Sequence, residues 1–256
     1  MNAGPYTIAF LVGLTVLIVF GVLQFWFIAS FRAGRRPRFR AITAYRMLRG
    51  QMGRAIESGR ELHVSIGTGG VSGEDTATTL AGLAVAEYLA DEAATSGIAP
   101  VVTTADATGL IVAEDALRRP YIRQGDLSDY PRWSARLPAL NATQYAAATM
   151  DFLNHEPVLA NIMSGAFSSE IALIDQAAYN NDLPQFSGAA DPRALAVMMT
   201  STDNLLVGEE MYAAKAYLRA QLPHLASLRA ADIVRILIVV AIVVLLVVGL
   251  ITGLGA

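Results

Sequence analysis

The chain contains no cysteine, which excludes disulfide bonds, zinc–thiolate sites, iron–sulfur clusters and thiol nucleophiles. Lysine is nearly missing too, because Lys215 is the single lysine among 19 basic residues. Schiff-base chemistry and phosphate binding by lysine are therefore not expected. The three histidines, His63, His155 and His224, lack the H-E-x-x-H spacing of a zinc-binding helix. This inventory predicts no cofactor.

Charged side chains are missing from two long apolar stretches, Ile8–Ser30 and Ile236–Leu254. Each has about the 20 residues that a helix needs to cross the hydrocarbon core of a bilayer. We therefore expect one transmembrane helix within residues 1–31 and another within residues 236–256. A cleaved signal peptide carries its basic residues before the apolar stretch, whereas here they follow it, so the first helix is expected to remain as an anchor.

Arginine is concentrated directly after the first apolar stretch. Residues 32–60 carry nine arginines against Glu57, a balance of +8, whereas residues 61–218 carry twenty acids and seven bases, a balance of −13. The positive-inside rule then predicts a membrane protein with both termini outside and the main domain in the cytoplasm. The arginines expected to contact anionic lipid headgroups are Arg32, Arg35, Arg36, Arg38 and Arg40. An acidic domain is unsuited to nucleic acid, because phosphate binding needs a basic face.

The sequence between the apolar stretches is long enough for one globular domain. We expect a basic juxtamembrane helix or linker over residues 32–60, an α/β domain over 61–222 and a linker over 223–235. Apolar residues in Phe39–Ser58 recur at helical spacing, which predicts a helix whose arginines reach the headgroups. A solvated basic linker is the alternative.

Short apolar strands alternate with helical patterns in residues 61–222. The expected strands are 63–66, 101–105, 161–165 and 197–201, and the expected helices are 75–95, from Asp106 or Thr108 to Arg119, 141–154, 169–180 and one carrying 205–210. Residues 121–140, with their prolines, are expected to be irregular. Strands this apolar are typical of a mainly parallel sheet with helices on both faces, so the fold class is α/β.

The two halves of this domain follow a similar order. Asn161–Gly165 precedes a helix as His63–Gly67 does, and Leu205–Glu210 is similar to Leu110–Asp115, both at an offset of about 95–98 residues. These matches predict two pseudo-repeated βαβα halves. Chance similarity in an alanine-rich chain is the alternative.

A glycine-rich junction, Gly67–Gly73, lies between the first strand and the first helix of the domain. Bare backbone N–H groups at a helix N-terminus suit an anion, but the spacing matches neither a P-loop nor G-x-G-x-x-G. A tight turn capped by Ser72 or Asp75 is the alternative. The candidate ligand-binding residues are Gly67, Thr68, Gly69, Gly70, Ser72, Thr76, Asp106 and Asp203.

Three segments with the pattern of a strand end finish in small residues followed by a carboxylate, at Asp106, Asp191 and Asp203. In a parallel sheet these groups would gather at the carboxyl edge, where their oxygens could hold Mg²⁺. Aspartate is also a favoured helix N-cap, worth about 1 kcal/mol, and capping alone accounts for all three.

Glycines give the two apolar stretches small-residue faces, which let membrane helices pack closely. Gly249 and Gly253 form a G-x-x-x-G motif in the second stretch, and Gly13 and Gly21 lie in the first.

Four blocks, Ser65–Gly70, Thr104–Ala107, Asn154–Pro157 and Gly208–Glu210, resemble a bacterial membrane-protein family known as a domain of unknown function. The resemblance covers nearly the whole chain and implies the same two-anchor architecture. It carries no activity, cofactor or catalytic residue.

Our leading hypothesis from the sequence is a non-enzymatic, membrane-anchored scaffold that oligomerises laterally through its cytoplasmic α/β domain into a larger membrane complex, as a homo-oligomer or with related membrane proteins. The alternatives are a nucleotide- or small-anion-binding sensor at the inner membrane face, and a membrane-tethered hydrolase or transferase using Asp106, Asp203 or His155. No catalytic residue and no metal ligand can be assigned.

Overall fold

The computed structural model of the chain describes residues 5–35, 37, 39–95, 97–202 and 204–253. They form two compact units. One, which we call the helical unit, contains the two ends of the chain up to Arg40 and from Ala220 onward. The other, the α/β unit, comprises Ala41–Arg219. Each unit is described separately below.

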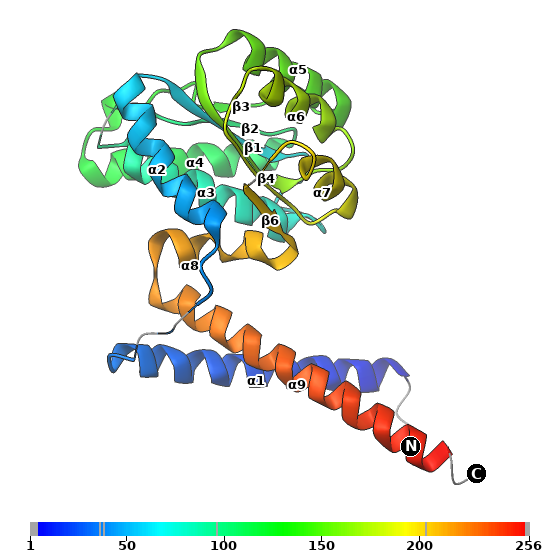
Figure 1. The fold of residues 1–256 in the computed structure, drawn as a ribbon. Helices are drawn as coiled ribbons and strands as arrows, with labels where there is room; N and C mark the ends of the chain where they lie inside the picture. Colours follow the sequence, from blue (N-terminus) through cyan, green and yellow to red (C-terminus); the bar gives the residue numbers. More distant parts are fainter. Residues whose placement is uncertain (1–4, 36, 38, 96, 203, 254–256) are drawn as a thin grey trace. The chain divides into compact units, whose positions relative to one another are not determined.

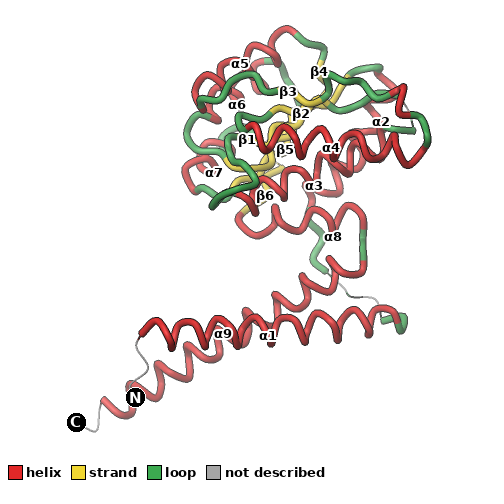
Figure 2. The backbone as a smooth tube through the Cα atoms, turned by 180° about the vertical axis from the view of Figure 1, so that it is seen from behind, coloured by secondary structure: helices red, strands yellow, loops and turns green. Residues whose placement is uncertain are grey.

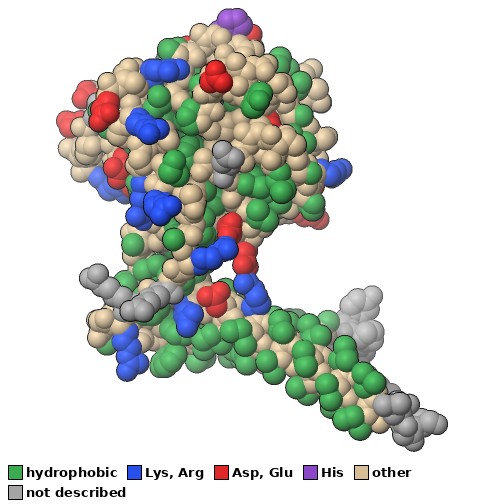
Figure 3. All heavy atoms as spheres, viewed as in Figure 1, with side chains coloured by type: hydrophobic (Ala, Val, Ile, Leu, Met, Phe, Trp, Pro, Cys, Tyr) green, Lys and Arg blue, Asp and Glu red, His purple; other side chains and the backbone are tan. Residues whose placement is uncertain are grey.

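The helical unit contains α1 (Pro5–Arg32) and α9 (Leu222–Gly253). Within them, Ala9–Arg32 and Leu222–Thr252 are long and apolar enough to cross a membrane, as the sequence predicts. Residues 223–235, expected to be a linker, are instead the first turns of α9, because Pro223 suits the start of a helix and only helix-compatible residues follow it. Figure 3 shows apolar side chains along most of α9, with charged ones gathered toward its start.

The two apolar helices contact each other through a small cluster. Phe27 of α1 is buried against Ala226 and Ala230 of α9, with Phe20, Leu23, Ile28, Phe31 and Ile233 packed around them. Figures 1 and 2 both show α1 and α9 side by side. The contact therefore joins the second half of α1 to the first turns of α9, with alanine as the small residue.

The α/β unit contains one six-stranded sheet in the order β3-β2-β1-β4-β5-β6. All five strand pairs are parallel, which confirms the predicted parallel sheet. The strands are β1 (Glu61–Gly67), β2 (Val101–Thr103), β3 (Ala135–Arg136), β4 (Val158–Ala166), β5 (Gln185–Ala189) and β6 (Asn204–Val207). This is the order of doubly wound, Rossmann-type sheets, whose two halves meet at β1 and β4.

Helices cover both faces of the sheet, as predicted. Figures 1 and 2 show α3 and α4 on one face, together with α2, and α5, α6 and α7 on the other. Their bounds are α2 (Thr43–Ser58), α3 (Thr76–Ala93), α4 (Ala107–Gln124), α5 (Ala142–His155), α6 (Ile171–Asn180), α7 (Pro192–Met198) and α8 (Ala214–Arg219), with 3₁₀ turns at Leu127–Asp129 and Gly208–Ala213.

Very close packing joins α3 to the centre of the sheet. A methyl group added at Gly82 of α3 would lie 1.8 Å from the carbonyl oxygen of Ser164 in β4. Gly165 is similarly tight, because its added methyl group would lie 2.0 Å from the carbonyl oxygen of Ile66 in β1. Helix and strand backbones are therefore in contact where the two halves of the sheet meet.

Helix α2 belongs to the α/β unit. Its residues Tyr45, Leu48 and Met52 are buried, which confirms the helix predicted for this stretch. The Tyr45 hydroxyl donates to the carbonyl oxygen of Glu210 at 2.7 Å, and its ring stacks on that of Tyr217 at 5.5 Å. These contacts hold α2, at the beginning of the α/β unit, against α8, at its end.

Two sequence predictions near the end of the domain are wrong. Residues 197–201, expected as a strand, lie in and directly after α7, because Asp191 caps that helix and Pro192 starts it. Residues 205–210, expected in a helix, begin as strand β6, which ends where Gly208 adopts a φ of +57°. Four- and five-residue apolar runs do not distinguish helix from strand by periodicity.

The two halves do repeat the order strand–helix–strand–helix, as β1-α3-β2-α4 and β4-α6-β5-α7. The predicted offset holds for the first strand of each half. The second strand of the second half is β5 rather than residues 197–201, so its cap Asp191 corresponds to Asp106 at an offset of 85 residues.

The stretch expected to be irregular, 121–140, is partly ordered. Helix α4 passes through Pro120 and ends at Gln124, where Gly125 adopts a φ of +83°. Strand β3 pairs with β2 further on. Proline removes one helical hydrogen bond, which an otherwise well-packed helix can tolerate.

Candidate functional site

In doubly wound sheets, ligands bind outside the carboxyl ends of the strands where the strand order reverses. That position here lies after β1 and β4. The glycine-rich junction Gly67–Gly73 follows β1, and Phe167 and Ser168 follow β4. The sequence therefore brings its best candidate loop to the place that the topology favours.

The glycine turn after β1 is held against β4. Gly67 has a φ of +82°, and a methyl group at this position would lie 2.0 Å from the carbonyl oxygen of Ala166. The Thr68 backbone N–H donates to that same oxygen at 2.8 Å. Gly67 is therefore required both for its backbone conformation and for the close approach of the two strands.

The next two glycines are equally enclosed. A methyl group at Gly69 would lie 2.6 Å from Cβ of Asp75, and one at Gly70 would lie 2.5 Å from Oδ1 of Asp106. The backbone N–H of Val71 donates to the Thr108 hydroxyl at 3.0 Å, which ties the turn to the start of α4. The glycines that would give a ligand access to the backbone are thus used by the packing of the chain itself.

The carboxylates at the carboxyl edge cap helices. Asp106 accepts a hydrogen bond from the Gly109 backbone N–H at 2.9 Å, and Asp191 accepts one from the Arg193 N–H at 2.9 Å. The Thr108 hydroxyl and the Gly109 N–H lower the pKa of Asp106. The Arg193 backbone N–H and side chain lower the pKa of Asp191. Both groups are therefore carboxylates at neutral pH.

The other predicted ligand residues have more varied positions. Ser72 is exposed, and the Thr76 hydroxyl donates to the carbonyl oxygen of Gly73 at 2.7 Å. Asp75 occupies the N-cap position of α3 without a side-chain cap bond. Asp203 lies outside the described residues. Within the described part of the chain, no three His, Asp or Glu residues gather in a way that could hold a metal ion.

A hollow of about 190 Å³ remains open between the two halves of the sheet edge. Its residues are Thr68, Asp75, Thr78, Ala166, Phe167, Ser168, Ala190, Asp191 and Arg193. Arg193 forms an ion pair with Asp191 at 3.0 Å, so the positive charge in the hollow is already neutralised. The volume is below the roughly 300–1,000 Å³ of pockets that hold drug-sized molecules, so a dinucleotide does not fit.

A buried polar network, which sequence analysis missed, lies under this edge on the face covered by α5. Nδ1 of His63 is 2.7 Å from Oδ1 of Asn161, and its Nε2 is 2.9 Å from the Thr103 hydroxyl. The Tyr145 hydroxyl is 2.9 Å from that of Thr103 and 2.5 Å from that of Ser65. Polar residues at alternate positions of a buried strand, His63 and Ser65, were the available signal.

His63 is neutral in this setting. Burial lowers its pKa from 6.5 to about 4, and the positive charge of Arg136 adds to that effect, although the bond to Asn161 opposes it. With the Asn161 carbonyl oxygen as acceptor, Nδ1 carries the proton and Nε2 accepts from Thr103. The network therefore orders the side chains of three neighbouring strands and one helix.

The structure also places His155 and some of the arginines of the basic stretch. His155 is the last residue of α5 and is exposed beside Asp151, at 3.1 Å. Arg36 and Arg38 lie outside the described residues. Two arginines of the basic stretch form hydrogen bonds within the α/β unit. Arg49 donates to the carbonyl oxygen of Tyr217, and Arg60 donates to that of Val158.

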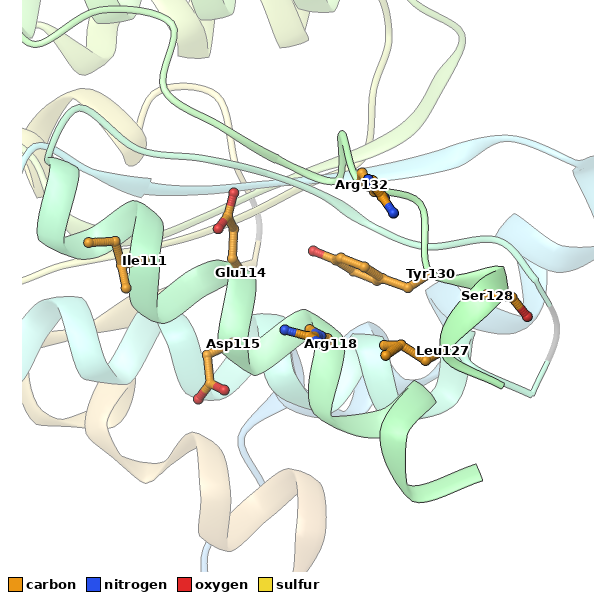
Figure 4. Close-up of a pocket in the computed structure, with 8 residues that line it drawn as sticks. All are labelled: Ile111, Glu114, Asp115, Arg118, Leu127, Ser128, Tyr130 and Arg132. Carbon is orange, nitrogen blue, oxygen red and sulfur yellow. The ribbon is translucent and has the colours of Figure 1, made fainter. Parts of the chain in front are cut away.

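A second hollow, of about 560 Å³, lies between α4 and the segment that follows it. Figure 4 shows Ile111, Glu114, Asp115 and Arg118 on α4, and Leu127, Ser128, Tyr130 and Arg132 on the segment that follows it. We call these eight residues the α4 groove. Sequence analysis did not identify it, because its residues are spread over an ordinary polar helix face and a loop.

The chain belongs to a family described as a domain of unknown function, DUF6754, which matches residues 4–255. The match covers both apolar helices and the α/β unit, which confirms the resemblance inferred from the four sequence blocks. No curated protein and no solved structure matches the chain.

Proposed function

We propose that this member of the DUF6754 family is a non-enzymatic structural protein, which assembles laterally in the bacterial cytoplasmic membrane with copies of itself or with related membrane proteins. In this proposal α1 and α9 both cross the membrane, both termini lie outside, and the α/β unit lies in the cytoplasm. The charge pattern supports this orientation, because α1 ends at Arg32 and Arg229 and Arg235 precede the apolar part of α9.

The observation that carries the proposal is the position of the glycines in the two apolar helices. Contact within the chain uses Phe27, Ala226 and Ala230. Among the described residues, by contrast, nothing lies within 4 Å of a methyl group added at Gly13, Gly21 or Gly249. The surroundings of Gly253 lie outside the described residues. Small-residue faces that the chain itself leaves uncovered suit contacts with helices of other subunits.

The carboxyl edge of the sheet supports a structural role as well. Gly67, Gly69 and Gly70 are needed for packing, and Asp106 and Asp191 cap helices. The groups that could perform chemistry are therefore engaged in holding the fold. Anchoring at both ends also fixes the orientation of neighbouring copies, so lateral contacts lose less rotational freedom than in solution.

The mass of the particle in lipid nanodiscs or detergent tests this proposal. We expect multiples of the 27.2 kDa chain mass. Leucine at Gly13 and Gly249 together should shift the distribution to smaller particles, because the larger side chain separates closely packed helices. Val244→Leu, at an exposed position of α9, is the matched control. A wild-type chain that stays monomeric at all concentrations contradicts the proposal.

The 190 Å³ hollow favours one alternative, a sensor for a small anion or small polar molecule at the inner membrane face. Both halves of the doubly wound sheet contribute to this hollow, with Thr68 and Ser168 supplying hydroxyl groups. Thermal unfolding against a panel of nucleotides, phosphate and Mg²⁺ tests this alternative. A shift that disappears in Arg193→Ala would support it, and no shift with any compound would remove its support.

A further inference from the structure

The α4 groove carries charged groups of both signs on one exposed surface. Glu114 and Arg118 lie one helical turn apart on α4, and Arg132 lies on the segment after the helix. Among the described residues, Glu114, Arg118 and Arg132 form no ion pair, whereas Asp115 pairs with Arg119. Two charges of opposite sign at i and i+4 normally approach each other, so their separation here leaves both able to meet an outside group.

Apolar side chains border these charges. Ile111 is 67 % exposed and Leu127 is 41 % exposed, and both line the groove. Trp133, which directly follows Arg132, is 82 % exposed. Tryptophan and arginine are the residues most enriched among those that dominate protein–protein binding. A tryptophan this exposed next to an arginine of the groove is therefore characteristic of a docking surface.

Tyr130 lines the same groove. Its ring is half-buried and packs edge-on against Tyr121, with ring centroids 5.5 Å apart. Within the described residues, its oxygen has no hydrogen-bond partner, although water does not reach it. Figure 4 shows this ring lying between Arg118 and Arg132.

We infer that the α4 groove is an interface between two copies of this chain, related by a twofold axis. In such a contact each residue i of one copy meets residue j of the other, and j meets i. Arg118 of each copy then meets Glu114 of the partner copy. A surface of a single charge sign would repel its own copy, whereas this mixed surface attracts it.

This inference rests on the proposed lateral assembly and names one of its contacts. Copies anchored in one membrane share the same orientation relative to its plane, so a twofold axis that relates them must run along the membrane normal. The exposed lining of the groove suits a protein surface better than a small ligand, which would be largely enclosed by its pocket.

Charge reversal in the full-length chain tests the pairing directly. We expect Arg118→Glu and Glu114→Arg each to weaken the association of copies by about tenfold or more, because each places like charges opposite each other. The double variant Arg118→Glu/Glu114→Arg should restore the association, because both pairs are reversed together. Glu156→Arg, at an exposed position outside the groove, is the matched control. Unchanged far-UV circular dichroism in each variant shows that the fold is retained.

Cross-linking gives a second, independent measurement, since the chain has no cysteine of its own. Ser128→Cys in the groove should form a covalent dimer with a short bis-maleimide in membranes, whereas Gln176→Cys on α6 should not. A cross-link to a protein of different mass, or a double charge variant that stays weak, overturns the twofold contact. If the wild type assembles but the groove variants change neither the particle size nor the cross-linking, the twofold contact is also overturned, while lateral assembly itself still stands. A monomeric wild type contradicts the proposed function itself.

Discussion

Replacing Gly82 with alanine should destabilise the α/β unit, although alanine is the better helix former. Within a helix the change from glycine normally stabilises by about 0.5–1 kcal/mol. At Gly82, however, the new methyl group would lie 1.8 Å from a backbone oxygen of Ser164, where at least 3.0 Å is needed. Helix α3 must therefore move away from β4 by about 1.2 Å. Overpacking of this kind costs about 1–3 kcal/mol, and backbone contacts belong at the upper end.

The expected net effect is a loss of about 2 kcal/mol, which lowers Tm by about 4–8 °C for a unit of this size. Gly53→Ala is the matched control, because Gly53 also lies inside a helix but an added methyl group meets nothing within 4 Å. That variant should raise Tm by about 1–4 °C. Thermal unfolding of the full-length chain followed by far-UV circular dichroism measures both. If Gly82→Ala were as stable as Gly53→Ala, the close contact of α3 with β4 would be refuted.

Three further predictions concern buried and capping groups. Burial lowers the pKa of His63 to about 4, so only the unfolded chain takes up a proton there as the pH falls from 6.5 to 4. The free energy of unfolding should therefore fall by on the order of 3 kcal/mol in that window. Urea titrations at several pH values should show that His63→Gln loses most of this dependence of the unfolding free energy on pH. Tyr145→Phe leaves the buried hydroxyl groups of Ser65 and Thr103 with one partner fewer and should lower the free energy of unfolding by about 1–3 kcal/mol. Tyr212→Phe, at an exposed position, should lower it by less than about 0.5 kcal/mol. Equal losses in the two variants would argue against the network. Asp106→Ala should cost about 1 kcal/mol and Asp106→Asn much less, since asparagine also caps helices, and chemical denaturation that shows no difference would exclude the capping role.

Much of the architecture follows from local signals in the sequence. The two apolar helices follow from length and composition, and the helix starting after Asn141 follows from its cap, which accepts from Thr143 and Gln144. The parallel sheet follows from the apolar character of strands such as β4. These signals are local, so no knowledge of the tertiary contacts is needed to interpret them.

The strand order and the site geometry depend on contacts between distant residues. His63 and Asn161 are neighbours in the sheet although 98 residues separate them, so their hydrogen bond leaves no local pattern. The use of Gly69 for packing rather than for a ligand is likewise decided by Ala166 and Thr79, which surround it. Residues 197–201 show a further limit, because a short apolar run suits either helix or strand until its neighbours are known.

The contact between α2 and α8 brings the two ends of the α/β unit together. Tyr45 near the beginning of the α/β unit and Tyr217 near its end stack on each other, so both ends of the unit leave from one place. The ends of α1 and α9 to which they connect are also in contact, through Phe31 and the Ala226 region. The α/β unit is thus an insertion in the loop of a helical hairpin. Excising it and closing the gap with a short linker should leave a hairpin that still forms.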